Sequence, residues 1–398
     1  MLRPGHGLIL CSATLLILGV IMVNSAGQTV GSDPAFSSTS TSLPSILTSR
    51  TAIYAVAAGI VLVLASLVPL GFLRQRTGWQ APTTWLALII ICLLLAVHVP
   101  GLSRTMNGSS RWLRLGSMSF QPSELAKWGM LIILAWHCAR QGQAGMQRFT
   151  TGLLPPGWLL LIVCALIAIE DLGTAVLIGL VGMCMLMAGG VKVRQAALVI
   201  PLGIVGFLAA LWQSPYRVNR LLAYLNPYDD PQGIGYHIVQ SLASISGGGL
   251  AGHGLGNGVR KFGYLPEDTT DFIFAVICEE LGIFGAALVV FLYAGMLLCC
   301  LLIIRHADSV FERLLGLGVS VTIGLQALIN LLVVTGMAPT KGIALPLISH
   351  GGTGWLLTAC SIGLLVGIDR RTAARRAVSI TDRANPAVMS ISPHVASA

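Results

Sequence analysis

The sequence predicts an all-α membrane protein with about ten transmembrane helices, and three observations lead to this fold class. Hydrophobic residues make up 55% of the 398 positions and charged residues only 10%, whereas soluble domains carry about 25% charged residues. Apolar runs of about 17–25 residues, the length that crosses a bilayer as a helix, recur along the chain. Lys and Arg concentrate in alternate connecting segments, as expected for loops on opposite sides of a membrane.

Ten apolar runs account for the predicted helices, seven before a long polar segment and three after it. In order, they are Leu8–Val23, Ile53–Leu73, Thr83–Val99, Pro122–Cys138, Leu153–Ile169, Leu172–Met187, Ala196–Leu211, Phe272–Ile304, Leu314–Met337 and Leu345–Ile368. The run Phe272–Ile304 is too long for one crossing, so we expect its first turns to lie at or above the outer surface, or the helix to tilt strongly.

The runs define one membrane domain over residues 1–371. A long outer segment, residues 214–271, connects the seventh helix to the eighth. The tail, residues 372–398, has no apolar period and is predicted to be disordered.

The distribution of basic residues predicts that both termini face the cytoplasm. In this orientation the inner segments hold fourteen of the 24 Lys and Arg residues, counting Arg3 and five arginines of the C-terminal tail. Such an excess marks the cytoplasmic side of a membrane protein. We interpret the N-terminal apolar run as an uncleaved first helix, because its removal would leave nine helices and put the basic tail on the wrong side.

Composition and spacing argue against several classes of function. All nine cysteines fall within predicted helices, without the spacing of a zinc site or a disulfide framework. The basic tail explains most of the net charge of +9, so no nucleic-acid partner is expected. The string Gly247–Gly252 fits G-x-G-x-x-G but lacks a βαβ unit, which argues against a nucleotide-binding fold. No cofactor is evident, and a requirement for a divalent cation is left open.

The stretch Gln240–Gly285 is the most informative about function. A glycine-rich loop leads through Asp271, at the end of the outer segment, into an apolar helix with the adjacent acids Glu279 and Glu280. Ionisable residues inside a membrane are costly and mark a functional site by default. Asp271 is interpreted either as a helix N-cap or as a general base. Glu279 and Glu280 need a cavity or a basic partner, and a structural ion pair that fixes helix packing is the alternative to a functional role.

A second charged pair lies at the start of the fourth predicted helix. Glu124 and Lys127 are three residues apart, close enough on a helix to form an ion pair. Pro122 fits the first helical position, and Glu124 fits the third position of a capping box. A cap with an ion pair is one interpretation. The other is that Lys127 lines a cavity open to the lipid and contacts an anionic substrate.

Several sequence blocks together resemble the SEDS family (shape, elongation, division and sporulation), the polytopic peptidoglycan polymerases typified by FtsW and RodA. The blocks are Arg111–Trp112, Phe120–Lys127, Asp171–Thr174, Asn226–Gly233, Gln240–Leu242, Tyr264–Glu267, Thr270–Phe274, Glu279–Gly282, Pro339–Gly342 and Leu345–Ser349. They follow in the order and spacing of that family. The Gly-Leu-Gly and Tyr-Leu-Pro-Glu variants resemble the division branch, typified by FtsW, more than the elongation branch.

The resemblance implies polymerisation of lipid II into a growing glycan strand at the outer face of the cytoplasmic membrane, at the division septum. The 4-hydroxyl of one lipid II attacks C1 of a sugar that carries undecaprenyl pyrophosphate, with inversion and without a covalent enzyme intermediate. The reaction needs a carboxylate base and cations that stabilise the leaving pyrophosphate. The resemblance implies Asp271 as this base. It also implies a class B penicillin-binding protein as the partner that crosslinks the product.

The same reaction suggests which residues bind substrate. The candidates share a position at or near the outer side: Arg111, Lys127, Arg217, Arg220, Arg260, Lys261, Lys341 and Ser349. Glu124, Glu279 and Glu280 are expected to support them through hydrogen bonds or ion pairs. The seven glycines of Gly247–Gly258 are expected to permit tight turns around a flat glycan or a lipid headgroup.

Two other classes of function remain open. A flippase or transporter of the lipid-linked precursor would also have about ten helices with central charges, but it should show paired repeats and broken helices at the midplane. No such pairing between the halves is found. A scaffold that only recruits division proteins would need neither Asp271 nor Glu279.

Overall fold

A computed structural model describes residues 3–27, 46–71, 78–99, 101–106, 109–115, 118–212, 215–258, 269–350 and 352–384. Within these ranges, a helix overlaps each of the ten predicted apolar runs. They are α1 (Pro4–Ala26), α3 (Arg50–Leu67), α5 (Pro82–Ala96), α6 (Pro122–Met146), α7 (Leu154–Glu170), α8 (Leu172–Ala188), α9 (Val193–Trp212), α12 (Ile273–His306), α13 (Val310–Val334) and α14 (Thr353–Ala384). Short helical turns, η1 (Gly78–Gln80) and η2 (Phe149–Leu153), precede α5 and α7.

Six helices of the described chain are long and apolar enough to cross a membrane: α1, α3, α7 extended by η2, α9, α12 and α13. Helices α5 and α8 are apolar but shorter, whereas α6 and α14 are long and carry charged residues. The prediction of a helical fold with several membrane-crossing helices is therefore confirmed.

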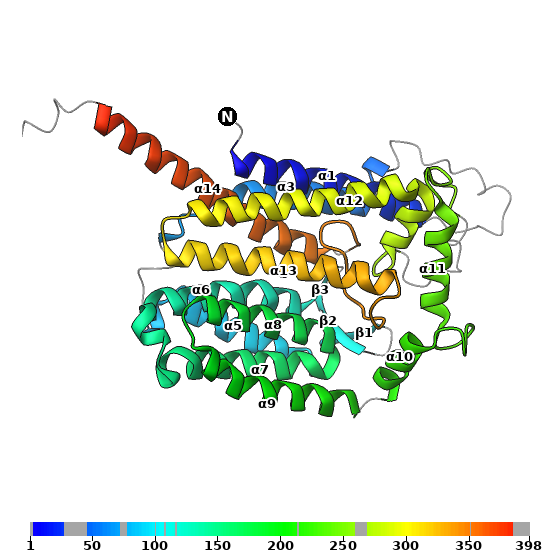
Figure 1. The fold of residues 1–398 in the computed structure, drawn as a ribbon, viewed down its shortest axis with the longest axis horizontal. Coiled ribbons are helices and arrows are strands. Elements are labelled where there is room, and N and C mark those ends of the chain that lie inside the picture. The colour runs from blue at the N-terminus through cyan, green and yellow to red at the C-terminus, as the bar shows by residue number, and fades with distance from the viewer. Residues whose placement is uncertain are drawn as a thin grey trace, which may run out of the picture.

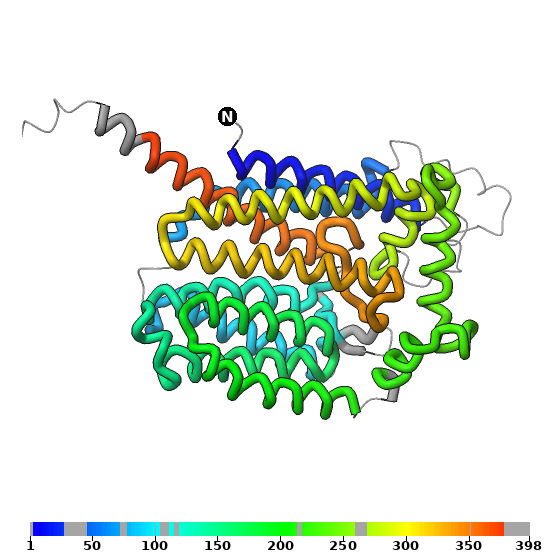
Figure 2. The backbone as a smooth tube through the Cα atoms, viewed as in Figure 1, coloured from blue at the N-terminus to red at the C-terminus, as the bar shows by residue number. Residues whose placement is uncertain are grey.

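The helices run side by side and form two groups (Figure 1). Helices α1, α3, α12 and α14 pack together in one group, and α5 to α8 pack in the other, with α9 at its edge. Helix α13 joins them, because it contacts α12 and α14 on one side and α6 and α8 on the other. The tube in Figure 2 shows α10 (Pro215–Leu225) and α11 (Tyr236–Gly248) at one end of the bundle, with the chain start and the end of α14 at the other.

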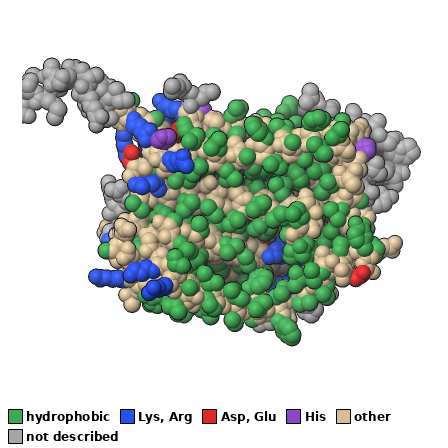
Figure 3. Space-filling view, in the orientation of Figure 1, with side chains coloured by type: hydrophobic (Ala, Val, Ile, Leu, Met, Phe, Trp, Pro, Cys, Tyr) green, Lys and Arg blue, Asp and Glu red, His purple; other side chains and the backbone are tan. Residues whose placement is uncertain are grey.

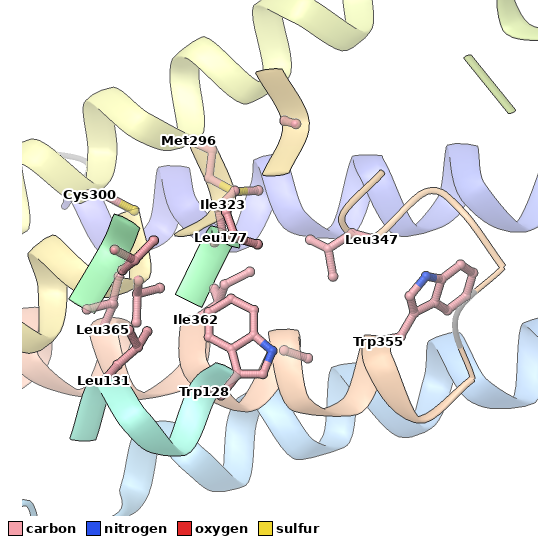
Figure 4. Close-up of a cluster of buried hydrophobic side chains, with 14 of the residues drawn as sticks. Trp128, Leu131, Leu177, Met296, Cys300, Ile323, Leu347, Trp355, Ile362 and Leu365 are labelled. Atoms are coloured by element: carbon pink, nitrogen blue, oxygen red, sulfur yellow. The ribbon is translucent and has the colours of Figure 1, made fainter. Parts of the chain in front are cut away.

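The core lies between the two groups (Figure 4). Trp128 and Leu131 of α6 pack near Ile323 of α13 and Ile362 of α14, and each of these side chains is at most 4% exposed. Burial of such side chains cannot drive association against lipid as it does against water, so close packing and hydrogen bonds between helices hold the bundle together.

The expectation of an all-α chain is wrong for three short described segments between α5 and α6. Strands β1 (Ser103–Met106), β2 (Ser109–Leu115) and β3 (Met118–Phe120) form an antiparallel sheet in the order β1-β2-β3. These segments are too short and polar for a further helix across the membrane, and antiparallel pairing satisfies their backbone donors and acceptors locally.

The described part of the outer segment covers residues 215–258 and 269–271. It contains α10 and α11, followed by a glycine-rich loop that packs on α12. Helix α12 is broken at Gly282 (φ 64°, ψ −159°), so the excess length of this run is taken up by a kink in addition to any tilt. A Cβ on Gly252 would lie 2.2 Å from the carbonyl oxygen of Glu280. Gly252 therefore allows the loop to approach α12. The positive φ of Gly249, Gly252, Gly254 and Gly256 agrees with the expected tight turns, and their role toward a glycan or a headgroup stays a prediction.

Two boundaries near the C-terminus also differ from the prediction. The run that begins at Leu345 starts as a buried loop, in which the Ser349 hydroxyl accepts a hydrogen bond from the Leu345 N–H (2.7 Å), and α14 begins only at Thr353. At its other end α14 continues through residues 372–384, so disorder after residue 371 is wrong for this part. Alanine and arginine favour helix there, and Arg375 pairs with Asp308 (3.2 Å). Residues 385–398 lie outside the described part.

Candidate active site at one end of the bundle

The candidate site lies at the end of the bundle that carries the small sheet and α10. Four segments that are far apart in sequence meet there: β2, the α7–α8 junction, the turn before α12 and the loop after α13. Gly342 marks their meeting point, because a Cβ at this glycine would lie 3.1 Å from Asp271 Oδ2 and 3.8 Å from Arg111 Nη1. The predicted base and one predicted cation therefore flank the same backbone position.

Arg111 is held in place by the α7–α8 junction. Its Nε donates a hydrogen bond to the carbonyl oxygen of Glu170 (3.0 Å), and its Nη1 lies 3.6 Å from Asp171 Oδ2. Asp171 is fixed in turn, because it caps α8 and accepts hydrogen bonds from the backbone N–H (3.1 Å) and the hydroxyl (2.8 Å) of Thr174. Side-chain exposure is 33% for Arg111 and 9% for Asp171, so the arginine points from a buried anchor toward the accessible side.

Asp271 directly precedes α12, and its side chain is half-buried. The N-cap of α12 is Phe272, so the alternative in which Asp271 caps this helix is wrong. The carbonyl oxygen of Asp271 accepts a hydrogen bond from Asn330 Nδ2 (2.8 Å), which also donates to the carbonyl oxygen of Ile343 (2.8 Å). Asn330 of α13 thereby ties the turn that carries Asp271 to the loop that carries Gly342.

Lys341 and Arg220 add positive charge beside this loop. Lys341 is half-buried, and its Nζ lies 5.7 Å from the centre of the Phe207 ring on α9. Burial lowers the pKa of Lys341, while the negative charge of Asp171 raises it. Arg220 of α10 donates to the carbonyl oxygen of Thr340 (3.4 Å). Together with Arg111, these cations surround the loop next to the Asp271 carboxylate.

Arg217 lies close by but has a different set of contacts. Its guanidinium donates to the carbonyl oxygens of Ala168 (2.9 Å), Ile169 (2.9 Å) and Ala210 (2.8 Å). It therefore ties α10 to the ends of α7 and α9, where helix carbonyl groups lack partners within the helix. Arg260 and Lys261, the other cations predicted on the outer side, lie outside the described residues.

The Glu124–Lys127 ion pair is confirmed, with 2.8 Å between Lys127 Nζ and Glu124 Oε1. Lys127 is only 3% exposed and also donates to Gln326 Oε1 (3.0 Å). Gln326 Nε2 donates to the carbonyl oxygen of Ala344. The expected capping box does not form, because the N-cap residue Gln121 makes no side-chain hydrogen bond. Lys127 is therefore buried, and it is connected through Gln326 to the loop after α13 that carries Gly342.

Glu279 and Glu280 belong to a separate buried cluster. Ser25 Oγ of α1 donates to both carboxylate oxygens of Glu280 (2.9 and 2.8 Å), and the N–H of Gly256 donates to Glu280 Oε2 (3.1 Å). The carbonyl oxygen of Glu279 accepts a hydrogen bond from the N–H of His253 (3.0 Å). Both glutamates are at most 3% exposed. They join α1, α12 and the glycine-rich loop.

Ser349 lies in the buried turn before α14, next to His350, whose N–H donates a hydrogen bond to the carbonyl oxygen of Thr269 (2.8 Å) in the turn before α12. Ser349 is 1% exposed, and its carbonyl oxygen accepts a hydrogen bond from Trp355 Nε1 (2.7 Å). With the bond from the Leu345 N–H, its polar groups stabilise the buried turn before α14.

Sequence reasoning missed three polar residues of the site: Asp171, Gln326 and Asn330. Gln326 and Asn330 stand four residues apart in the mostly apolar C-terminal half of α13, which places them on one helix face. This spacing was the available signal. Asp171 lies in a recognised block, but its ion pair with Arg111 joins positions 60 residues apart. Such a contact leaves no local pattern.

The arrangement combines a half-buried carboxylate with cations in and around the loop after α13. A carboxylate in this setting can accept a proton from a hydroxyl group, and preorganised cations stabilise a developing anion. Among the described residues, no group of three or more His, Cys, Asp or Glu side chains is placed to hold a metal ion.

A family model and individual relatives match most of this chain. The family model for FtsW, RodA and SpoVE, described as “Cell cycle protein”, matches residues 6–374. A relative from Thioalkalivibrio sulfidiphilus, named “Probable peptidoglycan glycosyltransferase FtsW”, is 38% identical over 378 residues, which cover 93% of this chain and 90% of the relative. A protein of the same name from Escherichia coli O6:H1 is 36% identical over 370 residues, covering 91% and 85%.

Solved structures share the fold. A chain in a structure described as “Structural coordination of polymerization and crosslinking by a peptidoglycan synthase complex” matches with a TM-score of 0.71 and 26% identity, over 92% of this chain and 97% of that one. The rod shape determining protein RodA of Thermus thermophilus matches with a TM-score of 0.61 and 27% identity, over 92% and 96%. The family match over residues 6–374 and the relatives at 36–38% identity show that this chain belongs to the FtsW/RodA/SpoVE family of cell cycle proteins.

Proposed function

We propose that this protein is a peptidoglycan glycosyltransferase that polymerises lipid II at the outer face of the cytoplasmic membrane, for the septal wall made in cell division. The observation that carries the proposal is the position of Gly342, flanked by the Asp271 carboxylate and the Arg111 guanidinium. Family membership and the names of the relatives support the reaction type.

In this reaction Asp271 is the general base. The 4-hydroxyl of the acceptor sugar gives its proton to the carboxylate as its oxygen attacks C1 of the donor sugar. The C1–O bond to undecaprenyl pyrophosphate breaks, and the bonding electrons leave with the pyrophosphate. Arg111, Arg220 and Lys341 surround the loop beside Asp271. They are suited to stabilise the charge of the leaving group, because a partly buried site strengthens such interactions.

The proposed topology has ten membrane helices with both termini in the cytoplasm. The site then faces outward, together with α10, α11 and the rest of segment 214–271. Figure 3 supports this orientation, because Lys and Arg side chains gather at the opposite end of the bundle, where α14 leaves it. An excess of basic residues is characteristic of the cytoplasmic side.

The proposed partner is a class B penicillin-binding protein that crosslinks the new glycan. The described fold is a membrane bundle with one small sheet, and its proposed reaction makes glycan strands without crosslinks. The matched structure of a peptidoglycan synthase complex, which concerns polymerisation and crosslinking, supports this assignment.

The test uses purified protein, fluorescently labelled lipid II and the variant Asp271→Asn. Asparagine keeps the shape of the side chain and removes its basicity, so we expect glycan synthesis to fall about 10²–10⁴-fold, the usual contribution of general-base catalysis. Asp229→Asn, an equal change at an exposed position of the outer segment, should polymerise at the wild-type rate. Thermal unfolding of all three proteins should be alike.

Each alternative gives a different result. If Asp271→Asn polymerises at the wild-type rate, the base is another residue. If the wild-type protein with its partner makes no glycan but moves lipid II across vesicle membranes, the protein is a flippase. If it does neither and still binds division proteins, it is a scaffold.

A further inference from the structure

A cavity outside the candidate site lies at the opposite end of the bundle, between the C-terminal half of α6, the α12–α13 turn and α14. It encloses about 450 Å³. The residues that decide its chemistry are Trp136, Arg140, Asp308, Val310, Phe311 and Arg375. We propose that this cavity binds the phosphate-bearing headgroup of an anionic phospholipid from the inner leaflet.

The charges of the cavity favour an anion. Arg140 and Arg375 line it together with one acid, Asp308. Arg375 Nη1 lies 3.2 Å from Asp308 Oδ2, and the two side chains are 60% and 46% exposed. An exposed pair of this kind contributes little to stability, so a phosphate can take Arg375 from Asp308 at small cost. Arginine suits this role, because its planar guanidinium binds phosphate oxygens in pairs.

The position of Arg140 is fixed by its neighbour. Its guanidinium carbon lies 5.4 Å from the centre of the Trp136 ring, one turn earlier on the same face of α6. This cation–π contact directs the charge toward the cavity. Helix α13 begins at the cavity wall with Val310, and its N-terminus is capped by Ser309 and Glu312, so the two arginines supply the attraction for an anion.

The remaining wall is apolar, which distinguishes a lipid from a small soluble anion. Phe311 is 2% exposed and closes the cavity, whereas Val310 is 50% exposed at its rim. Trp136 adds an aromatic ring, a side chain that is enriched at membrane interfaces. The glycerol and first methylene groups of a lipid would cover this apolar surface, and inorganic phosphate would not.

The location fits the same ligand. The cavity lies at the end of the bundle where Lys and Arg side chains gather (Figure 3), which is the cytoplasmic end in the proposed topology. Basic pockets between membrane helices on this side bind anionic headgroups. A bound headgroup would connect α6, the α12–α13 turn and α14. The inference depends on the proposed orientation and is independent of the role of Asp271.

The experiment measures lipid binding to the purified full-length protein by native mass spectrometry and by the rise in Tm. Phosphatidylglycerol is the probe, and phosphatidylcholine is the neutral comparison. We expect Arg140→Gln and Arg375→Gln each to weaken phosphatidylglycerol binding about tenfold or more, as for the loss of a hydrogen bond to a charged group. Arg148→Gln, an equal change at an exposed position after α6 that does not line the cavity, should weaken it about fivefold or less.

Lipid II polymerisation in phosphatidylcholine should be equal in all variants, because the changed residues lie far from the candidate site. This readout and the Tm without lipid exclude misfolding as a cause of lost binding. An equal loss in Arg148→Gln would overturn the proposal in favour of diffuse attraction to the membrane surface. Displacement of phosphatidylglycerol by millimolar inorganic phosphate would instead show that the cavity takes a soluble anion, and preferential binding of phosphatidylcholine would also refute it.

Discussion

The substitution Gly342→Ala is the sharpest perturbation that the candidate site offers. The added methyl group would lie 3.1 Å from Asp271 Oδ2, closer than carbon and oxygen normally approach. The Asp271 carboxylate must then shift by a few tenths of an ångström. A misplacement of about 1 Å can lower a rate about 10²-fold. Because the expected shift is smaller, we expect the rate of lipid II polymerisation to fall by about tenfold and by no more than about 10²-fold.

The fold should tolerate this change. Gly342 is not among the glycines with positive φ, so alanine can adopt its backbone conformation, and replacing glycine there can even stabilise the protein by about 0.4–1 kcal/mol. Gly59→Ala on α3 is the matched control, because a Cβ at Gly59 would contact nothing within 4 Å. The assay is the initial rate of glycan synthesis from labelled lipid II, measured beside Tm. Wild-type polymerisation by Gly342→Ala would refute the placement of the reacting hydroxyl at Asp271.

Three further predictions test the supporting structure. Lys127→Ala should lower the yield of folded protein, because breaking a buried ion pair costs about 3–5 kcal/mol. The double change Glu124→Ala/Lys127→Ala should recover part of that yield. Normal folding of Lys127→Ala without polymerisation would indicate that Lys127 contacts substrate instead. Gly252→Ala should lower Tm more than Gly256→Ala, since both have positive φ but only the first would place its Cβ 2.2 Å from a carbonyl oxygen of α12; equal losses would show that φ alone matters. A reporter fused after Arg376 should be cytoplasmic and one inserted between α10 and α11 external, and finding both on one side would rule out the ten-helix topology.

Much of the fold follows from local sequence. Each apolar run contains or overlaps a helix, and the bounds differ most for the last run. Helices form because a chain in lipid must satisfy its backbone hydrogen bonds internally. The Glu124–Lys127 pair was predictable as well, because residues three apart on a helix lie close together. The candidate base and three of the seven candidate cations, Arg111, Lys127 and Lys341, came from recognised sequence blocks, and their chemistry is a property of the residue types.

The local rules failed where contacts between distant segments decide the conformation. The break at Gly282 is stabilised by the glycine-rich loop, whose Gly249 carbonyl oxygen accepts a hydrogen bond from the Ile283 N–H (3.1 Å). The run at Leu345 looked helical, but the Ser349 hydrogen bonds hold it as a buried turn. Arg217 was predicted only as a substrate-binding cation, and the local sequence gave no sign that its guanidinium also bonds helix carbonyl groups.

The sequence by itself determined that the chain is a helical membrane protein, where its long apolar helices approximately lie and which residue types are available for acid–base chemistry, because these depend on hydrophobicity and on the composition of short blocks. Only the tertiary structure decided that Arg111, Asp171, Asp271 and Gly342 meet at one end of the bundle, while Glu279 and Glu280 form a separate cluster with Ser25. The physical reason is that these contacts join residues up to 255 positions apart. They are fixed by how helices pack against one another, which no local spacing encodes.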